Sequence, residues 1–225
     1  MQFNRLKILI NDDNFNKIKN TKVLILGLGG VGSYVVESLV RSGFNHLILV
    51  DYDHVDITNL NRQIMTNLNN IGHKKGDVLK DRILSINRDC QVTFLDMFYS
   101  EESNYILDKY NIDYIVDACD TINSKKSIIK YAINHNINII SCMGTGNKMD
   151  PSKLSITDIN HTTYDPIAKI LRKWLKEENI KNKIMVVSSI EKPIKLNGQI
   201  IGSNSFVPGT AGLLIASYII KNIIK

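Results

Sequence analysis

Continuous apolar runs alternate with segments of helical spacing over most of the chain. The run at 22–26 predicts a strand buried on both faces, and apolar residues at every third or fourth position over 31–41 predict the helix after it. The same alternation predicts strands at 46–50, 91–95, 112–116 and 137–141 and helices at 74–87, 101–109 and 123–135. Strands and helices that take turns form parallel βαβ units, so the predicted fold class is α/β with a doubly wound, mostly parallel, Rossmann-like sheet.

The two ends of the chain depart from this alternation. Helical spacing at 5–19 predicts one or two short helices before the sheet. Beyond residue 144 the elements we expect are short antiparallel strands at 153–158 and 183–188, a helix at 166–178 and a C-terminal helix at 209–223. We therefore expect a single domain over 1–225, with a nucleotide-binding core at 1–144 and a substrate-side cap at 145–225 over the carboxyl ends of the strands.

Composition restricts the class of protein. The segment 207–220 is the most apolar, but its about 14 residues fall short of the roughly 20 that cross a bilayer, so we expect a buried helix and no membrane contact. The three cysteines, Cys90, Cys119 and Cys142, are widely spaced, which disfavours a disulfide framework or a Cys-x-x-Cys metal site. With no signal sequence at the N-terminus, these features predict a cytoplasmic location.

A glycine-rich turn between the first strand and its helix is the first candidate for chemistry. Gly27, Gly29 and Gly32 form Gly-x-Gly-x-x-Gly, followed by Asp51 at the end of the second strand. Gly27 permits a tight turn, Gly29 lets backbone approach a phosphate, and Gly32 lets the helix pack on the strand, while the helix N-terminus attracts an anion. Asp51 can accept hydrogen bonds from ribose hydroxyls, so the pattern predicts a nucleotide site, although NAD and ATP both remain possible ligands of it.

The polar stretch at 51–63 favours ATP, because a dehydrogenase usually turns promptly into its next helix. Asn59 and Arg62 are three residues apart and would project on one side of a helical turn, toward phosphates; a surface ion pair is the plainer alternative for Arg62. Lys75 begins the next helix, where an ammonium can neutralise phosphate oxygens or simply be solvated. Asp117 and Asp120 follow the fourth strand, and one could cap the next helix while the other holds Mg²⁺ through water.

Five motifs occur in a fixed order over 5–144: the glycine turn at 27–33, Asp51-x-Asp53, the polar run at 59–63, Gly72-x-x-Lys75 and Asp117-Ala118-x-Asp120. In this order they resemble the signature of the ubiquitin-activating-enzyme-like adenylyltransferases of the HesA, MoeB and ThiF type. The resemblance implies ATP and Mg²⁺ as ligands, with Arg62, Lys75 and Asp120 as catalytic residues and Asp120 at the metal. It implies nucleotide contacts from Gly27, Gly29, Gly30, Gly32, Asp51, Asp53, Asn59, Arg62, Gln63, Lys75 and Asp120. Arg5 looks like the arginine that reaches the ATP of the neighbouring subunit, which implies a homodimer.

The second half of the chain narrows the resemblance. The segments 141–151, 158–172, 187–193 and 202–208 look like those of the tRNA threonylcarbamoyladenosine dehydratases, so the resemblance covers nearly the whole chain. It implies that a threonyl carboxylate on a tRNA adenosine beside the anticodon is joined to AMP and then attacked by the neighbouring carbamoyl group. No enzyme nucleophile is needed for this second step, because it is intramolecular.

A net charge of +6 and a pI near 9.1 permit binding to RNA without proving it. Given the resemblance, the candidate tRNA contacts are Lys169, Arg172, Lys173 and Lys176, followed by Lys181 and Lys183; a solvated helix face is the alternative. Trp174 could stack on a base, but packing of its helix is the simpler role.

Two other functions compete with the tRNA enzyme. An adenylyltransferase for a ubiquitin-like sulfur-carrier protein would share the ATP site, but the paired zinc cysteines of many such enzymes are missing. A sulfur-transfer protein partner stays open. An NAD-dependent oxidoreductase would share the glycine turn and Asp51, but would give no role to Arg62 and Asp120.

Overall fold

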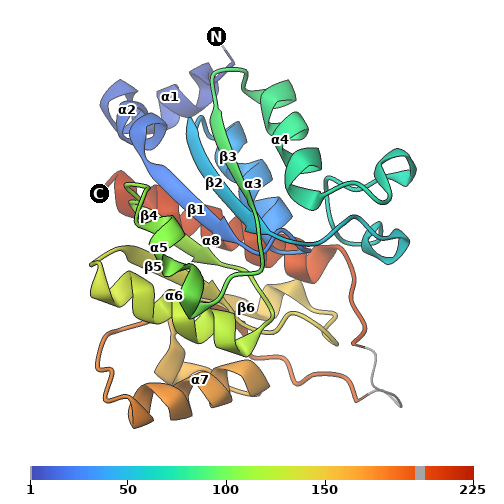
Figure 1. Ribbon diagram of the computed structural model, residues 1–225, viewed down its shortest axis with the longest axis vertical. Helices are drawn as coiled ribbons and strands as arrows, with labels where there is room; N and C mark the ends of the chain where they lie inside the picture. Colours follow the sequence, from blue (N-terminus) through green and yellow to red (C-terminus); the bar gives the residue numbers. More distant parts are fainter. Residues whose placement is uncertain (1, 196–200) are drawn as a thin grey trace.

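The computed structural model describes residues 2–195 and 201–225 and contains one sheet of seven strands in the order β3-β2-β1-β4-β5-β7-β6 (Figure 1). All neighbouring strands are parallel except β6 and β7, which are antiparallel. The strands are β1 (Lys22–Leu26), β2 (His46–Asp51), β3 (Gln91–Asp96), β4 (Tyr114–Asp117), β5 (Asn138–Cys142), β6 (Leu154–Asp158) and β7 (Met185–Ser189). The predicted doubly wound α/β fold is confirmed, including its short antiparallel addition.

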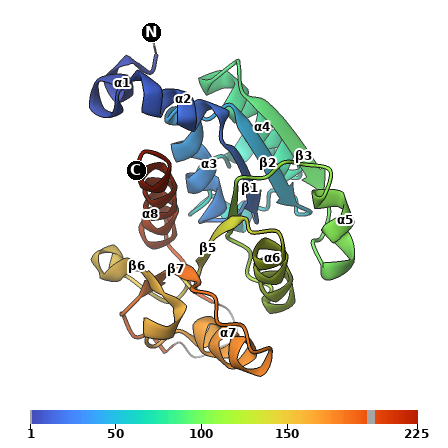
Figure 2. The same ribbon diagram turned by 90° about the vertical axis from the view of Figure 1, so that its left-hand side faces the viewer.

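The helices cover both faces of this sheet. They are α1 (Asn4–Ile10), α2 (Asp12–Asn20), α3 (Gly32–Arg41), α4 (Lys75–Ile86), α5 (Asn104–Leu107), α6 (Ile122–Asn134), α7 (Pro166–Glu177) and α8 (Phe206–Ile223). Helices α2, α3, α4 and α8 enclose one apolar core, and α5, α6 and α7 lie over the other face (Figure 2). The assignment follows strand alternation: Val23 and Ile25 belong to the first core, whereas Leu24 and Leu26 point into the second.

One predicted helix is much shorter than expected. Instead of a helix over 101–109, the chain forms a 3₁₀ turn at Glu101–Ser103 and a single α-helical turn at Asn104–Leu107. Leu107 is the one buried residue of α5, so the segment lacks the apolar stripe whose packing stabilises a longer helix.

The segment 145–225 does more than cap the strand ends. β7 pairs with β5, and β6 pairs with β7, so both strands extend the sheet itself, while α8 packs against α3 on one face. This part of the chain therefore contributes to the sheet and its core in addition to the cap expected of it. Long-range strand pairing of this kind leaves no local signal in a short apolar run.

Helix α8 has 18 residues and begins three residues before the predicted start. Pro208 is tolerated there because the N–H groups of a first helical turn have no partner within the helix. By length and composition α8 is the helix of the described chain that could cross a membrane, a test that buried core helices also pass. Its Val207, Ala211 and Ile215 have no exposed surface and pack in the first core.

Candidate active site

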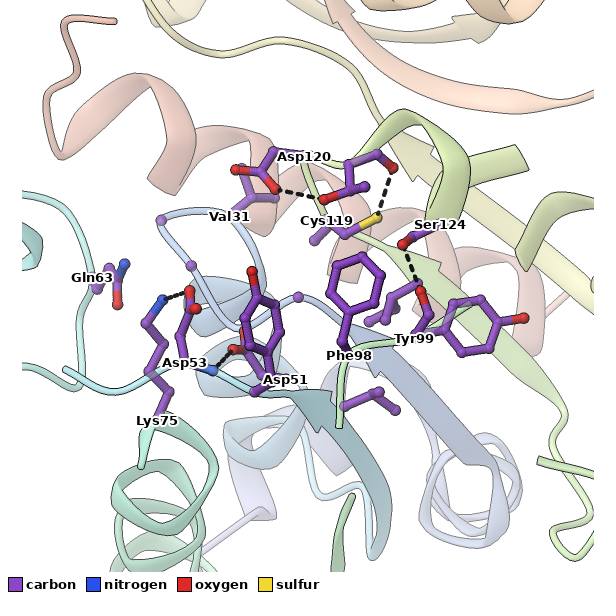
Figure 3. A pocket seen from close by; sticks show the side chains of 18 of the residues that line it. Val31, Asp51, Asp53, Gln63, Lys75, Phe98, Tyr99, Cys119, Asp120 and Ser124 are labelled. Carbon is purple, nitrogen blue, oxygen red and sulfur yellow. Dashed lines mark hydrogen bonds and ion pairs between the residues drawn. The ribbon is translucent and has the colours of Figure 1, made fainter. Parts of the chain in front are cut away.

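A cavity of about 330 Å³ lies at the carboxyl ends of β1, β2 and β4, where the strand order reverses (Figure 3). Most residues predicted to bind nucleotide line it: Gly27, Gly29, Gly30, Asp51, Asp53, Asn59, Arg62, Gln63, Lys75 and Asp120. Gly32 and Arg5 do not. Segments far apart in the sequence thus meet at one site, as their positions at strand ends predicted.

The glycine turn has the geometry expected for close approach to a phosphate. Gly27 has a φ of +88°, and a Cβ there would lie 2.8 Å from the backbone of Ala118, so only glycine fits. At Gly32 a Cβ would lie 1.8 Å from the carbonyl oxygen of Gly27, which explains why this glycine packs the helix rather than lining the cavity. At Gly29 the nearest atom is the Gln63 side chain at 4.0 Å, so the backbone on that side is open to a ligand.

Asp51 is buried and supports the glycine turn directly. Its Oδ2 accepts a hydrogen bond from the Leu28 N–H at 2.6 Å, and its Oδ1 accepts one from the Asp53 N–H at 2.8 Å. A carboxylate has about four lone-pair sites, so these two bonds leave room for a ribose hydroxyl. Asp51 therefore shapes the site as well as lining it, a role that the sequence pattern did not predict.

Lys75 and Asp53 form an ion pair in the wall of the cavity. The Lys75 Nζ lies 2.7 Å from the Asp53 Oδ2, and the lysine side chain is 7% exposed while that of Asp53 is 46% exposed (Figure 3). The buried aliphatic part of the Lys75 side chain limits where its ammonium can reach. Because Asp53 is more exposed, its ion pair with Lys75 can break when a phosphate oxygen binds the ammonium.

Asn59, Arg62 and Gln63 also line the cavity, and Gln63 lies on the same side as Lys75 and Asp53 (Figure 3). Asn59 ends the 3₁₀ turn η1 (Ile57–Asn59), and its side-chain oxygen accepts from the Asp56 N–H at 3.0 Å. The half-buried Arg62 donates from Nη1 to the Thr58 carbonyl at 2.8 Å, and it lines the cavity together with Asn59. Gln63 is 4% exposed, and its Oε1 has no hydrogen-bond partner among the described residues, which marks a place where a ligand could donate.

Asp117, the last residue of β4, and Asp120, just after it, have different environments, and neither caps the next helix. Thr121 is the N-cap of α6 and makes no side-chain cap, so the expected capping is wrong. Asp117 is fully buried and accepts hydrogen bonds from the Lys125 Nζ at 3.0 and 3.1 Å, and also from the hydroxyl of Ser141. Asp120 is exposed and lines the cavity, with no described lysine or arginine within ion-pair distance.

Lys125 is one residue near the site that sequence reasoning missed. Burial alone would lower the pKa of this lysine, but the adjacent Asp117 carboxylate raises it above the ordinary value, so the lysine is charged. The Nζ also donates to the carbonyl of Cys142 at 2.7 Å and so joins β4 to β5. The sequence did contain a signal for this pair: Lys125 lies on the same apolar face of the helix as Ile128 and Ile129. A lysine on a buried face is almost always paired with an acidic group.

The remaining wall is apolar and aromatic. It includes Met97, Phe98 and Tyr99 after β3, and the Ser124 hydroxyl donates to the Tyr99 carbonyl at 2.6 Å (Figure 3). Sequence reasoning missed this wall, because the apolar residues there carry no motif. A planar nucleobase would therefore bind against this wall rather than at the charged end of the cavity.

None of the cysteines is placed as a nucleophile. Burial raises the pKa of the Cys90 and Cys142 thiols to about 12, and burial together with the Asp117 carboxylate raises that of Cys119 still further. The thiols are therefore protonated near neutral pH, and they pack as small apolar groups.

The predicted RNA-contact residues on α7 are only partly free. Lys169, Lys173 and Lys176 are exposed, and Lys173 lies 3.7 Å from Glu177. The Arg172 Nη1 donates to the Thr162 hydroxyl and to the Ile159 carbonyl, so Arg172 also serves the packing of α7. Trp174 is 8% exposed within the core under α7, which confirms its packing role.

The late motifs hold several loops of the second half of the chain together. Asp165 caps α7 by accepting from the Ala168 N–H at 3.0 Å, and it also accepts from the Gly144 N–H at 2.9 Å. Lys148, 1% exposed, lies 3.6 Å from Asp165 and donates to the Gly144 carbonyl at 2.7 Å. Glu191 accepts from the N–H groups of Met149 and Asp150.

Comparison with known proteins agrees with this architecture. The ThiF family profile matches residues 3–225. A tRNA threonylcarbamoyladenosine dehydratase of Bacillus subtilis (strain 168) is 40% identical over 241 residues, covering 100% of this chain and 95% of the relative. The E. coli tRNA N6-threonylcarbamoyladenosine dehydratase TcdA in complex with AMP has a TM-score of 0.94 at 30% identity, covering 99% of this chain and 94% of that chain. Its complex with ATP gives 0.93 at 30% identity, with 99% and 93% covered.

One sulfur-transfer enzyme matches only part of the chain. The adenylyltransferase and sulfurtransferase MOCS3 of Drosophila persimilis is 34% identical over 110 residues, which is 48% of this chain and 24% of that protein. The full-length match thus favours the first group of relatives over the second.

Proposed function

The chain belongs to the ThiF family, and from that premise we propose that it is an ATP-dependent tRNA threonylcarbamoyladenosine dehydratase. The observation that carries the proposal is the cavity at the strand ends, where the glycine turn, Arg62, Lys75 and Asp120 face one space. The full-length relative that is 40% identical bears the name of this activity, and a structural relative binds ATP.

The reaction has two steps. The threonyl carboxylate of the modified adenosine attacks the α-phosphorus of ATP, and pyrophosphate leaves. The neighbouring carbamoyl group then attacks the activated acyl carbon, a ring closes and AMP leaves. The carboxylate oxygen departs on AMP, so the net change in the nucleoside is the loss of one water.

The residues of the cavity can serve the first step by binding and by charge. The glycine turn and Asp51 would hold the phosphates and the ribose, while Arg62 and Lys75 would stabilise the negative charge that develops on the leaving pyrophosphate. Lys75 would exchange Asp53 for a phosphate oxygen. Since the second step is intramolecular, it needs the substrate held in a folded-back conformation rather than a protein nucleophile.

The charge of the cavity supports Mg²⁺ as a companion of ATP. The charged side chains that line it are Asp51, Asp53 and Asp120 against Arg62 and Lys75, so a triphosphate needs further positive charge to enter. No cluster of three His, Cys, Asp or Glu side chains suited to a metal occurs within residues 2–195 and 201–225. Mg²⁺ is commonly held by one or two carboxylates plus phosphates, and Asp120 would supply the carboxylate; the ion would withdraw charge from the phosphates.

We also propose that the enzyme works as a homodimer in the cytoplasm, where its RNA substrate is modified. Arg5 lies on α1, is exposed and is absent from the lining of the cavity of its own chain. A second subunit could bring its Arg5 to this cavity and so supply positive charge for the triphosphate. Ile8 and Leu9 on the same helix are 85% and 80% exposed, an apolar surface that a partner could cover.

The test is incubation with ATP, Mg²⁺ and threonylcarbamoylated tRNA. We expect the modified nucleoside to lose the mass of one water, with AMP formed in equal amount. Adenylation of a sulfur-carrier protein in place of the RNA would instead identify the chain as an adenylyltransferase for that protein. Tight binding of NADH without binding of ATP would refute it.

A further inference from the structure

A continuous rim of hydrogen-bonded loops leads away from the Arg62 side of the cavity. The Asn61 side chain donates to the Ser203 carbonyl at 3.0 Å, and the neighbouring Gly202 N–H donates to the Asn147 Oδ1 at 2.6 Å. The Asn147 carbonyl in turn accepts from the Ile194 N–H at 2.7 Å. We call this path, from Asn61 through 201–203 and Asn147 to the loop at 190–194, the substrate rim.

An aromatic ring and a lysine meet at the far end of the substrate rim. The Lys192 Nζ lies 5.0 Å from the ring centroid of Tyr164, and the tyrosine is 55% exposed. Among the described residues, no carboxylate lies within ion-pair distance of Lys192. The pair therefore exposes an aromatic face and an unpaired positive charge side by side on the surface.

The position of this ring is fixed by the chain on either side of it. Tyr164 has a φ of +55°, a left-handed conformation that is uncommon for a bulky residue. The next residue, Asp165, is held by the Gly144 and Ala168 N–H groups and by Lys148. A strained backbone held by its surroundings is a feature of functional sites, and here the residue after the ring is tied to Gly144, two residues after β5.

We propose that Tyr164 and Lys192 form a stacking site for a nucleobase of the substrate RNA that neighbours the modified adenosine. Exposed aromatic rings bind unpaired bases by stacking, and a lysine beside the ring attracts the phosphate between two nucleotides. Lys169, exposed one helical turn after Asp165, continues the positive surface. The proposal rests on the proposed function, because it assumes that the RNA delivers its modified base to the cavity along the substrate rim.

The chain contains a matched control for this pair. On α5, Tyr105 is 64% exposed and Lys109 lies over its ring at 5.9 Å, which reproduces the same chemistry. In both views α6 lies between α5 and α7, so this pair is separated from the substrate rim (Figures 1 and 2).

The experiment measures dehydration and binding of an anticodon stem-loop RNA that carries threonylcarbamoyladenosine. We expect Tyr164→Ala to raise the KM and Kd for this RNA roughly tenfold, Tyr164→Phe to leave them near wild type, and Tyr105→Ala to have no effect. Because alanine is strained at positive φ, Tyr164→Asn is included, since asparagine tolerates this conformation while removing the ring. Turnover of the free modified nucleoside and the Kd for ATP should be the same in all variants.

The two proposals can fail separately. If Tyr164→Ala and Tyr164→Asn bind and process the RNA as well as Tyr105→Ala does, the stacking site is refuted while the enzyme assignment stands. Equal loss of free-nucleoside turnover would also refute it, since the effect would then lie in the cavity. If the wild type dehydrates neither substrate, the proposed function fails instead.

Discussion

Asp120 and Arg62 have similar surroundings: each lines the cavity, and neither belongs to a buried network of ion pairs. We therefore expect Asp120→Ala and Arg62→Ala each to reduce turnover by orders of magnitude, because each acts on charge that develops during the reaction. Single-turnover rates and thermal unfolding of both variants provide the measurement. Unchanged rates, or a large loss of stability in either variant, would contradict the roles given to them.

Asp51 differs from these residues because it also holds backbone. Asp51→Ala leaves the buried Leu28 N–H without its acceptor, which should lower the free energy of unfolding by about 1–3 kcal/mol and also weaken ATP binding. Urea unfolding and calorimetry with ATP would measure the two effects. A variant with weaker ATP binding and wild-type stability would show that the bond from Leu28 contributes little.

Residues of the site were predictable where their position in a motif determined their environment. The glycine turn, Asn59, Arg62 and Lys75 were predicted from spacing and all reach the site except Gly32, which packs the helix instead. The expected capping by an aspartate at the end of the fourth strand is wrong, because the Asp117 carboxylate pairs with Lys125 and Ser141 inside the fold. Such partners leave no trace in local spacing.

At the scale of elements, one carboxylate holds α3 against α4. Glu37 on α3 accepts from the Arg82 Nε at 2.6 Å, from the Arg82 Nη2 at 2.9 Å and from the Arg41 Nε at 2.7 Å. Burial alone would raise the pKa of Glu37, but the hydrogen bonds from Arg82 and Arg41 outweigh it and place the pKa below its ordinary value of 4.5.

This pKa predicts how stability depends on pH. A carboxyl group whose pKa is lower in the folded state stabilises the protein above the unfolded pKa, and this contribution is lost as the pH falls through the folded value. Glu37→Gln should therefore cost about 1–3 kcal/mol at pH 7, with a smaller difference from wild type at pH 3. Urea unfolding of both proteins at the two pH values checks this; a pH-independent difference would exclude the ionic contribution.

Most helices were predictable from apolar periodicity, and most strands from short continuous apolar runs. The exceptions depend on tertiary structure. α5 is short because it buries only Leu107, and the place of β6 and β7 in the strand order depends on pairing between strands far apart in the sequence.

For the whole molecule, the proposed dimer makes each site depend on two chains. Arg5→Ala and Asp120→Ala proteins should each be inactive alone. Once their subunits are mixed and exchanged, about a quarter of wild-type activity should return, since half of the dimers then contain one intact site of two. Absence of recovery in a sample shown to contain mixed dimers would place Arg5 outside the active site.

The buried pair of Asp117 and Lys125 ties the evolution of two positions together. Loss of either charge alone leaves the other buried without its partner, which lowers the free energy of unfolding by about 3–5 kcal/mol. Replacing both residues with well-packed apolar ones can leave the stability nearly unchanged. Homologous sequences should consequently keep both charges or exchange both at once. Selection at these positions then reports on the fold, whereas selection at nearby Asp120 reports on the chemistry.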